Sequence, residues 1–146
     1  MSELPILLLD DGLPVPAPAR EGDAGLDLRS SIDATIAPAG GRLLVPTGIA
    51  LELPSGTAGL VLPRSGLALS HGVTCLNSPG LIDSGYHGEV KVILANLDPT
   101  EPFRVKRGDR IAQLVVVDIR VLTPVAVGEL SSSERGDGGF GHSGRT

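Results

Sequence analysis

Short apolar segments broken by Pro or Gly recur about every ten residues between positions 35 and 62. The chain carries 20 Gly and 12 Pro in 146 residues, which is too many for a helical protein and suits short strands joined by turns. This spacing is typical of an antiparallel β sandwich or barrel. The segments are Thr35–Ile36, Gly41–Val45, Gly48–Leu53 and Thr57–Leu62, and they are separated by Pro38, Pro46, Pro54 and Gly56.

One short helix and several further strands are predicted outside this region. The helix spans Gly66–Ser70, directly after Arg64-Ser65. Prolines at alternate positions make Asp11–Arg20 an extended connector. We expect one domain at residues 1–128, with an aliphatic core because the chain has no Trp, one Tyr and two Phe. Residues 129–146 are polar and Gly-rich and are predicted to form a flexible C-terminal arm. The further strands are Pro5–Leu9, Leu26–Leu28, Val73–Leu76 and Phe103–Val105.

The strongest strand prediction is Asp109–Ile119, which is apolar on both faces. An antiparallel strand in a small domain seldom has both faces covered by its own chain. A second subunit is therefore the expected cover, and the pattern predicts a homo-oligomer. Gln113 is polar inside this apolar strand, so it needs a partner, either in another chain or in a ligand.

Charge and composition exclude several classes of protein. A formal net charge of -5 argues against broad nucleic-acid binding, which needs a basic face. The only unbroken apolar run near the N-terminus, Ile6–Leu9, is too short for a membrane span or a signal-peptide core. A single cysteine, Cys75, fits a reducing compartment. We expect a soluble, cytoplasmic protein without nucleic-acid or membrane partners.

Candidate catalytic residues lie in Gly80–Val90, which has the turn chemistry of a hairpin returning through residues 89–94. A hairpin centred near His87 places Asp83 opposite Lys91 and Tyr86 at the tip. One carboxylate on a rigid ribbon could serve as a general base. The alternative is an ordinary turn in which Asp83 is only a cap and Tyr86 covers apolar surface.

Three other segments carry groups suited to phosphate or its counter-ion. Arg64-Ser65-Gly66 at a helix start could cradle an anion, although Ser65 could be only a cap. Asp27, in a Gly-flanked turn, could hold hydrated Mg²⁺ or simply cap that turn. Residues 135–144 hold five glycines around Phe140, so they form either a lid closing over a ligand or a disordered terminus.

In this order, five segments resemble the five motifs of the trimeric dUTPase family of bacterial type. The resemblance implies a jelly-roll-like fold of the β-clip type. It also implies a homotrimer whose active sites are shared between subunits, with the C-terminal arm of one subunit closing a site formed by the others. The segments are AGLDLRS (24–30), PRSGLA (63–68), GLIDSGYHGE (80–89), RGDRIAQLV (107–115) and RGDGGFGHSG (135–144).

The resemblance implies hydrolysis of dUTP to dUMP and pyrophosphate, which keeps uracil out of DNA and supplies dUMP for thymidylate synthesis. Asp83 would activate the water that attacks the α-phosphorus, and Mg²⁺ would sit mainly on the triphosphate, with Asp27 acting on it through water. Tyr86 would lie under the deoxyribose and exclude a 2′-hydroxyl. The phosphate groups would be bound by Arg64, Ser65, Gly66, Gln113, Arg135, Gly141 and Ser143; the uracil would be read by Asn77, by Leu81, Ile82 and Asp83 through their backbone, and by Lys91, and capped by Phe140.

Two rival functions have distinct requirements. The related dCTP deaminases need a glutamate in the base pocket, on the strand after the hairpin, and the corresponding residue here is Ile93. A non-catalytic nucleotide-binding module would have no use for a base aimed at the α-phosphate, and Asp83 argues against it. Ser143 stands where Thr is common in the family, and either hydroxyl can bind phosphate.

Overall fold

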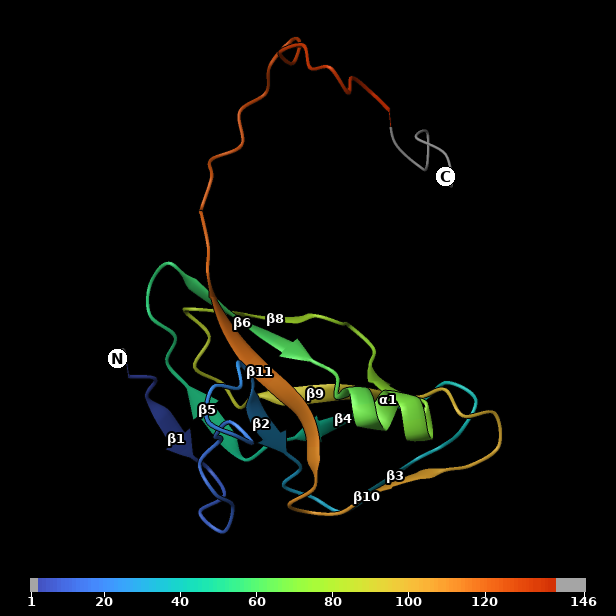
Figure 1. Cartoon of the computed structure of the whole chain (residues 1–146). Helices are drawn as coiled ribbons and strands as arrows, with labels where there is room; N and C mark the ends of the chain where they lie inside the picture. The colour runs from blue at the N-terminus through green and yellow to red at the C-terminus, as the bar shows by residue number, and fades with distance from the viewer. Residues whose placement is uncertain (1–2, 139–146) are drawn as a thin grey trace.

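The structure is a computed structural model that describes residues 3–138, and it is built almost entirely from antiparallel strands (Figure 1). Within those residues there are eleven strands and one helix. The all-β prediction is therefore confirmed. The strands are β1 (Ile6–Leu8), β2 (Leu26–Arg29), β3 (Ala34–Ile36), β4 (Gly41–Pro46), β5 (Ile49–Leu51), β6 (Thr57–Leu62), β7 (Val73–Cys75), β8 (Gly80–Asp83), β9 (Lys91–Asn96), β10 (Phe103–Val105) and β11 (Arg110–Asp118); the helix is α1 (Ser65–His71).

Two larger sheets enclose the core. One has the strand order β2-β11-β6-β8 and the other β4-β9-β7, while β1 pairs with β5 and β10 with β3 in two small ribbons. Every pairing is antiparallel. Both larger sheets contribute to a single buried cluster, so they pack face to face as in a sandwich.

The core is aliphatic, as the scarcity of aromatic residues predicts. From the four-stranded sheet it takes Leu28 and Leu114, and from the three-stranded sheet Val45 and Leu94, all fully buried. An added Cβ at Gly59 in β6 would lie 3.0 Å from Cδ1 of Leu114. A residue without a side chain is therefore needed where the Leu114 side chain packs against β6.

The predicted hairpin is wrong in its pairing. β8 lies beside β6, with Asp83 opposite Ala58, whereas β9 lies beside β4, with Lys91 opposite Pro46. The chain returning from β8 is instead bound by the segment after β4: the N–H of Val90 donates to the carbonyl of Ile49 at 2.8 Å. Asp83 and Lys91 thus end up in different sheets, with the loop 84–90 crossing between them (Figure 1).

Helix α1 confirms the helix prediction and extends it by one residue at each end. It starts directly after Arg64, which has extended backbone angles and makes no side-chain cap hydrogen bond. It ends at Gly72, whose left-handed conformation (φ 63°) lets its N–H bond the carbonyl of Ala68. No helix among residues 3–138 is long and apolar enough to cross a membrane.

Strand β11 is buried in its first half only. Ile111, Ala112 and Leu114 are buried, whereas Val116 is 37% exposed. After Asp118 the chain leaves the sheets and runs away from them as an irregular segment (Figure 1), and every side chain from Ile119 to Asp137 is exposed. The expected subunit cover of β11 and the flexible arm at 129–146 stay predictions.

Candidate active site

A hollow of about 490 Å³ opens where β8 and β9 diverge into separate sheets. The sequence placed six candidate residues in this region, and all six line the hollow even though the hairpin pairing is wrong. Because the two strands are not bonded to each other, their side chains and backbone border an open space rather than a ladder. The predicted lining residues are Asn77, Leu81, Ile82, Asp83, Tyr86 and Lys91; Leu44, Glu89, Val90 and Ile93 complete it.

Strand alternation aims Asp83 into the hollow. Gly80 and Ile82 of β8 are buried, and the alternating residues Leu81 and Asp83 are exposed. Successive side chains of a strand point to opposite faces, so the Asp83 carboxylate lies on the open face while Ile82 anchors the strand in the core. The Asp83 carbonyl also accepts the N–H of Tyr86 at 3.0 Å, which closes the turn after the strand. Asp83 therefore combines a fixed backbone with a solvent-accessible carboxylate.

Tyr86 is held against the backbone of its own loop. Its hydroxyl donates to the carbonyl oxygen of Glu89 at 2.9 Å. A Cβ added at Gly88 would lie 2.6 Å from the Tyr86 hydroxyl oxygen and 2.7 Å from Cζ, so the ring lies over a residue that must lack a side chain. Tyr86 as a whole residue is still 47% exposed, so part of its flat apolar ring is accessible at the edge of the hollow.

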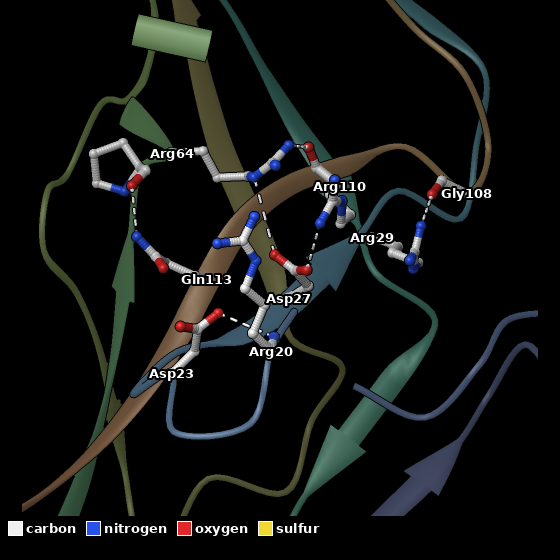
Figure 2. A network of polar contacts seen from close by, with 9 residues as sticks. Arg20, Asp23, Asp27, Arg29, Arg64, Gly108, Arg110 and Gln113 are labelled. Carbon is white, nitrogen blue, oxygen red and sulfur yellow. Dashed lines mark hydrogen bonds and ion pairs between the residues drawn. The ribbon is translucent and has the colours of Figure 1, made fainter. Parts of the chain in front are cut away.

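A second group of candidates surrounds the carboxylate of Asp27 (Figure 2). Arg110 Nη1 lies 3.1 Å from Asp27 Oδ2, and Arg64 Nε lies 3.9 Å from Asp27 Oδ1. Arg64 Nη1 also donates to the carbonyl of Arg110 at 2.8 Å. The Asp27 carboxylate thus orients two guanidinium groups. The three side chains together carry a net charge of +1. Arg110 was missed in the sequence analysis, although it belongs to the segment RGDRIAQLV.

Gln113 stands next to Asp27 because the two residues face each other across β11 and β2. Its Nε2 donates to the carbonyl of Pro63 at 3.2 Å, so the polar residue finds a partner within its own chain. A Cβ added at Gly25 would lie 2.6 Å from Gln113 Oε1, so that glycine leaves the space the amide occupies. The hollow here, of about 460 Å³, is lined by Gln113, Asp27, Gly25, Ala19, Asp23, Ala24, Leu62 and Val115.

A further hollow, of about 630 Å³, adjoins this network on the side of α1 and β10. It shares Arg64 and Arg110 with the Asp27 network and adds Arg29 and Arg104. Arg29 Nη1 donates to the carbonyl of Gly108 at 2.7 Å (Figure 2). Four arginines and one carboxylate, Asp109, therefore line this hollow in a chain with a net charge of -5, and the excess of arginines suits it to anions.

The two groups of candidates are far apart within one chain. Asp83 is level with Ala58 of β6, and Arg64 follows six residues later, beyond the end of that strand. At roughly 3.3 Å per residue the separation is about 20 Å. Ser65 and Gly66, both exposed at the start of α1, lie at the Arg64 end. Within one chain, Asp83 and Arg64 border separate hollows.

Of the arm residues named from the sequence, only Arg135 is described. It is exposed, and its Nε donates to the carbonyl of Gly138 at 2.8 Å, within a local turn. Phe140, Gly141 and Ser143 lie outside the described residues. Between residues 3 and 138 no group of three or more His, Cys, Asp or Glu side chains could hold a metal ion. Asp27 is the one predicted metal-associated residue, and it is paired with arginines.

Comparison with known proteins identifies the family of the chain. The family model described as dUTPase matches residues 11–144. The deoxyuridine 5'-triphosphate nucleotidohydrolase of Corynebacterium glutamicum is 51% identical over 146 residues, covering 100% of this chain and 97% of the relative. That of Mycobacterium tuberculosis H37Rv is 53% identical and covers 97% of this chain and 94% of the relative. Among solved structures, the Staphylococcus bacteriophage 80alpha dUTPase with dUpNHpp has a TM-score of 0.90 at 29% identity, covering 99% of both chains. With the jelly-roll β fold of these neighbours and a match over nearly its whole length, the chain belongs to the dUTPase family.

Proposed function

We propose that this dUTP diphosphatase hydrolyses dUTP to dUMP and pyrophosphate by attack of water on the α-phosphorus. The observation that carries the proposal is the presence of two complementary groups in one chain: a hollow with an accessible carboxylate beside a phenol ring, and a network of arginines and an amide around Asp27. The phage relative solved with dUpNHpp, a dUTP analogue, is similar over 99% of this chain and supports the same substrate here.

In this mechanism Asp83 is the general base. Its carboxylate accepts a proton from water as the water oxygen forms a bond to the α-phosphorus, and the bond from that phosphorus to the oxygen bridging to the β-phosphate breaks. The electron pair leaves with pyrophosphate. A general base of this kind contributes about 10²–10⁴ in rate, so positioning and charge neutralisation must supply most of the rest.

The phosphate chain would lie at the arginine end. Arg64 supplies charge, Gln113 an amide donor, and Ser65 and Gly66 a hydroxyl and backbone N–H groups. Mg²⁺ bound to the phosphates would neutralise their charge and leave the α-phosphorus more open to attack. Asp27 suits a contact through water better than direct ligation, because Arg64 and Arg110 already share its oxygens. Arg135, Gly141 and Ser143 of the arm would close over the phosphates.

The hollow between β8 and β9 would hold the nucleoside. Tyr86 offers its exposed ring face to the deoxyribose and leaves no room for a 2′-hydroxyl. The backbone of Leu81–Asp83, together with Asn77 and Lys91, would read uracil, and Phe140 would cap it. Ile93 lines this hollow where a deaminase needs a glutamate, so its aliphatic side chain favours hydrolysis over deamination.

The separation of about 20 Å between Asp83 and Arg64 along β6 supports sites shared between subunits, and the subunit assembly that we propose is a homotrimer. In this arrangement residues 1–128 form the β domain and residues 129–146 form the arm that closes a site made by other subunits. The product dUMP would feed thymidylate synthesis, and removal of dUTP would keep uracil out of DNA. We propose a cytoplasmic enzyme.

The test is pyrophosphate release from a panel of nucleotides. With Mg²⁺ present, we expect rapid release from dUTP, little from dCTP, dTTP or UTP, and no ammonia from dCTP. Asp83→Ala should bind dUpNHpp normally in calorimetry and turn dUTP over about 10²–10⁴ times more slowly. Asp118→Ala, which removes an exposed carboxylate at the end of β11, is the matched control and should keep the full rate. Near-normal turnover by Asp83→Ala would remove the residue from this role.

A further inference from the structure

The loop 84–90 carries Tyr86 and is not part of either sheet. β8 ends at Asp83 and β9 begins at Lys91, and each is bonded to a different sheet. His87 and Gly88 at its centre are exposed, as are Gly85 and Tyr86. A loop with so few buried groups would be free to move unless something else fixed it. The position of the Tyr86 ring therefore depends on contacts made by the two residues at the end of the loop, Glu89 and Val90.

Those two residues are hydrogen-bonded to residues 47–49, which lead from the end of β4 to the first residue of β5. The buried hydroxyl of Thr47 donates to the carbonyl of Val90 at 2.5 Å, and the N–H of Val90 donates to the carbonyl of Ile49 at 2.8 Å. The N–H of Gly48 donates to Glu89 Oε1 at 3.0 Å. The last of these is the only one made by a side chain of the loop itself, and its carboxylate is half-buried.

Glu89 is also the residue that holds the ring. Its main-chain carbonyl accepts the Tyr86 hydroxyl at 2.9 Å. Its second carboxylate oxygen, Oε2, lies 3.7 Å from Lys91 Nζ, so both oxygens are oriented. The side chain thus helps to hold the peptide group to which Tyr86 is bonded, together with the Val90 N–H of the same peptide, which is bonded to Ile49; a shift of Glu89 would move the ring.

We infer that Glu89 is a positioning residue for sugar discrimination: by tying its loop to Gly48, it holds the Tyr86 ring where the ring excludes a 2′-hydroxyl. The inference rests on the proposed function, in which Tyr86 lies under the deoxyribose. Glu89 itself touches no reacting atom. Its removal should loosen the ring, although Glu89 also lines the hollow and its carboxylate lies near Lys91.

The chain offers a direct readout of the ring, because Tyr86 is its only tyrosine and it has no tryptophan. Intrinsic fluorescence therefore reports Tyr86 alone. In Glu89→Ala we expect lower tyrosine anisotropy and an acrylamide quenching constant raised up to about twofold, because about half of the residue is already exposed. Glu89→Gln keeps an oxygen acceptor for Gly48 and should stay close to wild type. Glu101→Ala removes an exposed carboxylate elsewhere and is the matched control.

Kinetics test the specificity role. A contact made equally in the ground state and the transition state changes KM more than kcat. For Glu89→Ala we expect KM for dUTP to rise about three- to tenfold, and the ratio of kcat/KM for dUTP over UTP to fall by up to about tenfold. In a Tyr86→Phe background, which lacks the hydroxyl, the same substitution should have a clearly smaller effect on that ratio.

Three results would overturn the inference. The first is wild-type quenching and anisotropy in Glu89→Ala. The second is an unchanged dUTP over UTP ratio in a variant whose ring has loosened. The third is equal losses in Glu89→Gln and Glu89→Ala, because the acceptor oxygen would then not matter. Absence of dUTP hydrolysis in the wild-type protein would instead reject the proposed function, and the fluorescence comparison would still decide whether Glu89 holds Tyr86.

Discussion

Complementation between two inactive variants provides a quantitative test of shared active sites. Asp83→Ala removes the base from the hollow between β8 and β9, and Arg64→Ala removes a cation from the network around Asp27. The two residues are about 20 Å apart along β6 within one chain, so we expect a working site to take them from different subunits. Each variant alone should form a trimer in which every site lacks one of the two groups.

The expected recovery follows from counting. In an equal mixture of unfolded chains that assemble at random, half of the subunits carry an intact Asp83 and the other half an intact Arg64. When a site takes these residues from two different subunits, both are intact in about one quarter of the sites. When a site takes both from one subunit, none is intact, because every chain in the mixture lacks one of them. The two arrangements therefore predict about 25% and about 0% of the wild-type rate.

The assay is pyrophosphate release from dUTP after joint refolding from urea. Wild-type protein refolded in the same way sets the full rate, and each variant refolded alone sets the background. Mixing the two variants after folding controls for transfer between finished trimers. A different affinity tag on each variant, with purification through both tags, shows that mixed trimers have formed. The expected fraction of intact sites rises from about one quarter in the unfractionated mixture to about one third in the purified trimers, because trimers of a single variant have been removed.

A background rate from doubly tagged mixed trimers would refute the reasoning. It would mean that Asp83 and Arg64 reach the same substrate from one subunit, against their placement at opposite ends of β6. A recovered rate well above about one quarter in the unfractionated mixture, or well above about one third in the doubly tagged trimers, would mean that one substitution leaves substantial activity, which the rates of the single variants would reveal directly.

Three further predictions concern individual residues. Gly25→Ala should lower kcat about tenfold with little loss of stability, because the new Cβ would lie 2.6 Å from Gln113 Oε1 and displace the amide; Gly128→Ala, where a Cβ meets nothing within 4 Å, is the control, and equal rates would contradict this role. Leu94→Ala should lower the free energy of unfolding in urea by about 2–5 kcal/mol, because the side chain is fully buried; a loss below about 1 kcal/mol would contradict its place in the core. Burial raises the pKa of the Cys75 thiol from 9.0 to about 11. At pH 8 the native protein should therefore react with a thiol reagent about 100 times more slowly than the unfolded protein, and equal rates would contradict this. The stability contributed by the neutral thiol should decrease as pH rises from about 9 to 11.

Local signals in the sequence were sufficient for most of the fold. Pro and Gly placed the turns, and the helix at 65–71 follows from the break after β6 and Gly72. The pairing of β8 with β9 failed because turn chemistry around His87 describes only the loop. The residues that capture the returning chain, Thr47 and Gly48, lie 43 and 41 positions from their partners Val90 and Glu89. No short-range pattern contains that contact.

The candidate site shows the same division between local and distant information. Motif spacing identified Asp27 and Gln113 separately, but their contact depends on the register between β2 and β11, which spacing does not contain. The roles of Gly25 and Gly88 likewise appear only when the Gln113 amide and the Tyr86 ring are placed over them. Arg110 was overlooked because a charged residue at the start of an apolar strand is usually only a solvated end.

Two independent features of the single chain would be explained by contact with a second subunit. One is the separation of Asp83 from Arg64; the other is the apolar segment after β11, where Val121, Leu122 and Val125 are 80%, 74% and 77% exposed. Burying three such side chains would stabilise an assembly by about 5–9 kcal/mol for each chain. The segment also leads into the arm residues proposed to close the active site. Contacts that hold the subunits together and contacts that complete the site would therefore form in the same event, which is why we expect a folded, separated subunit to be inactive.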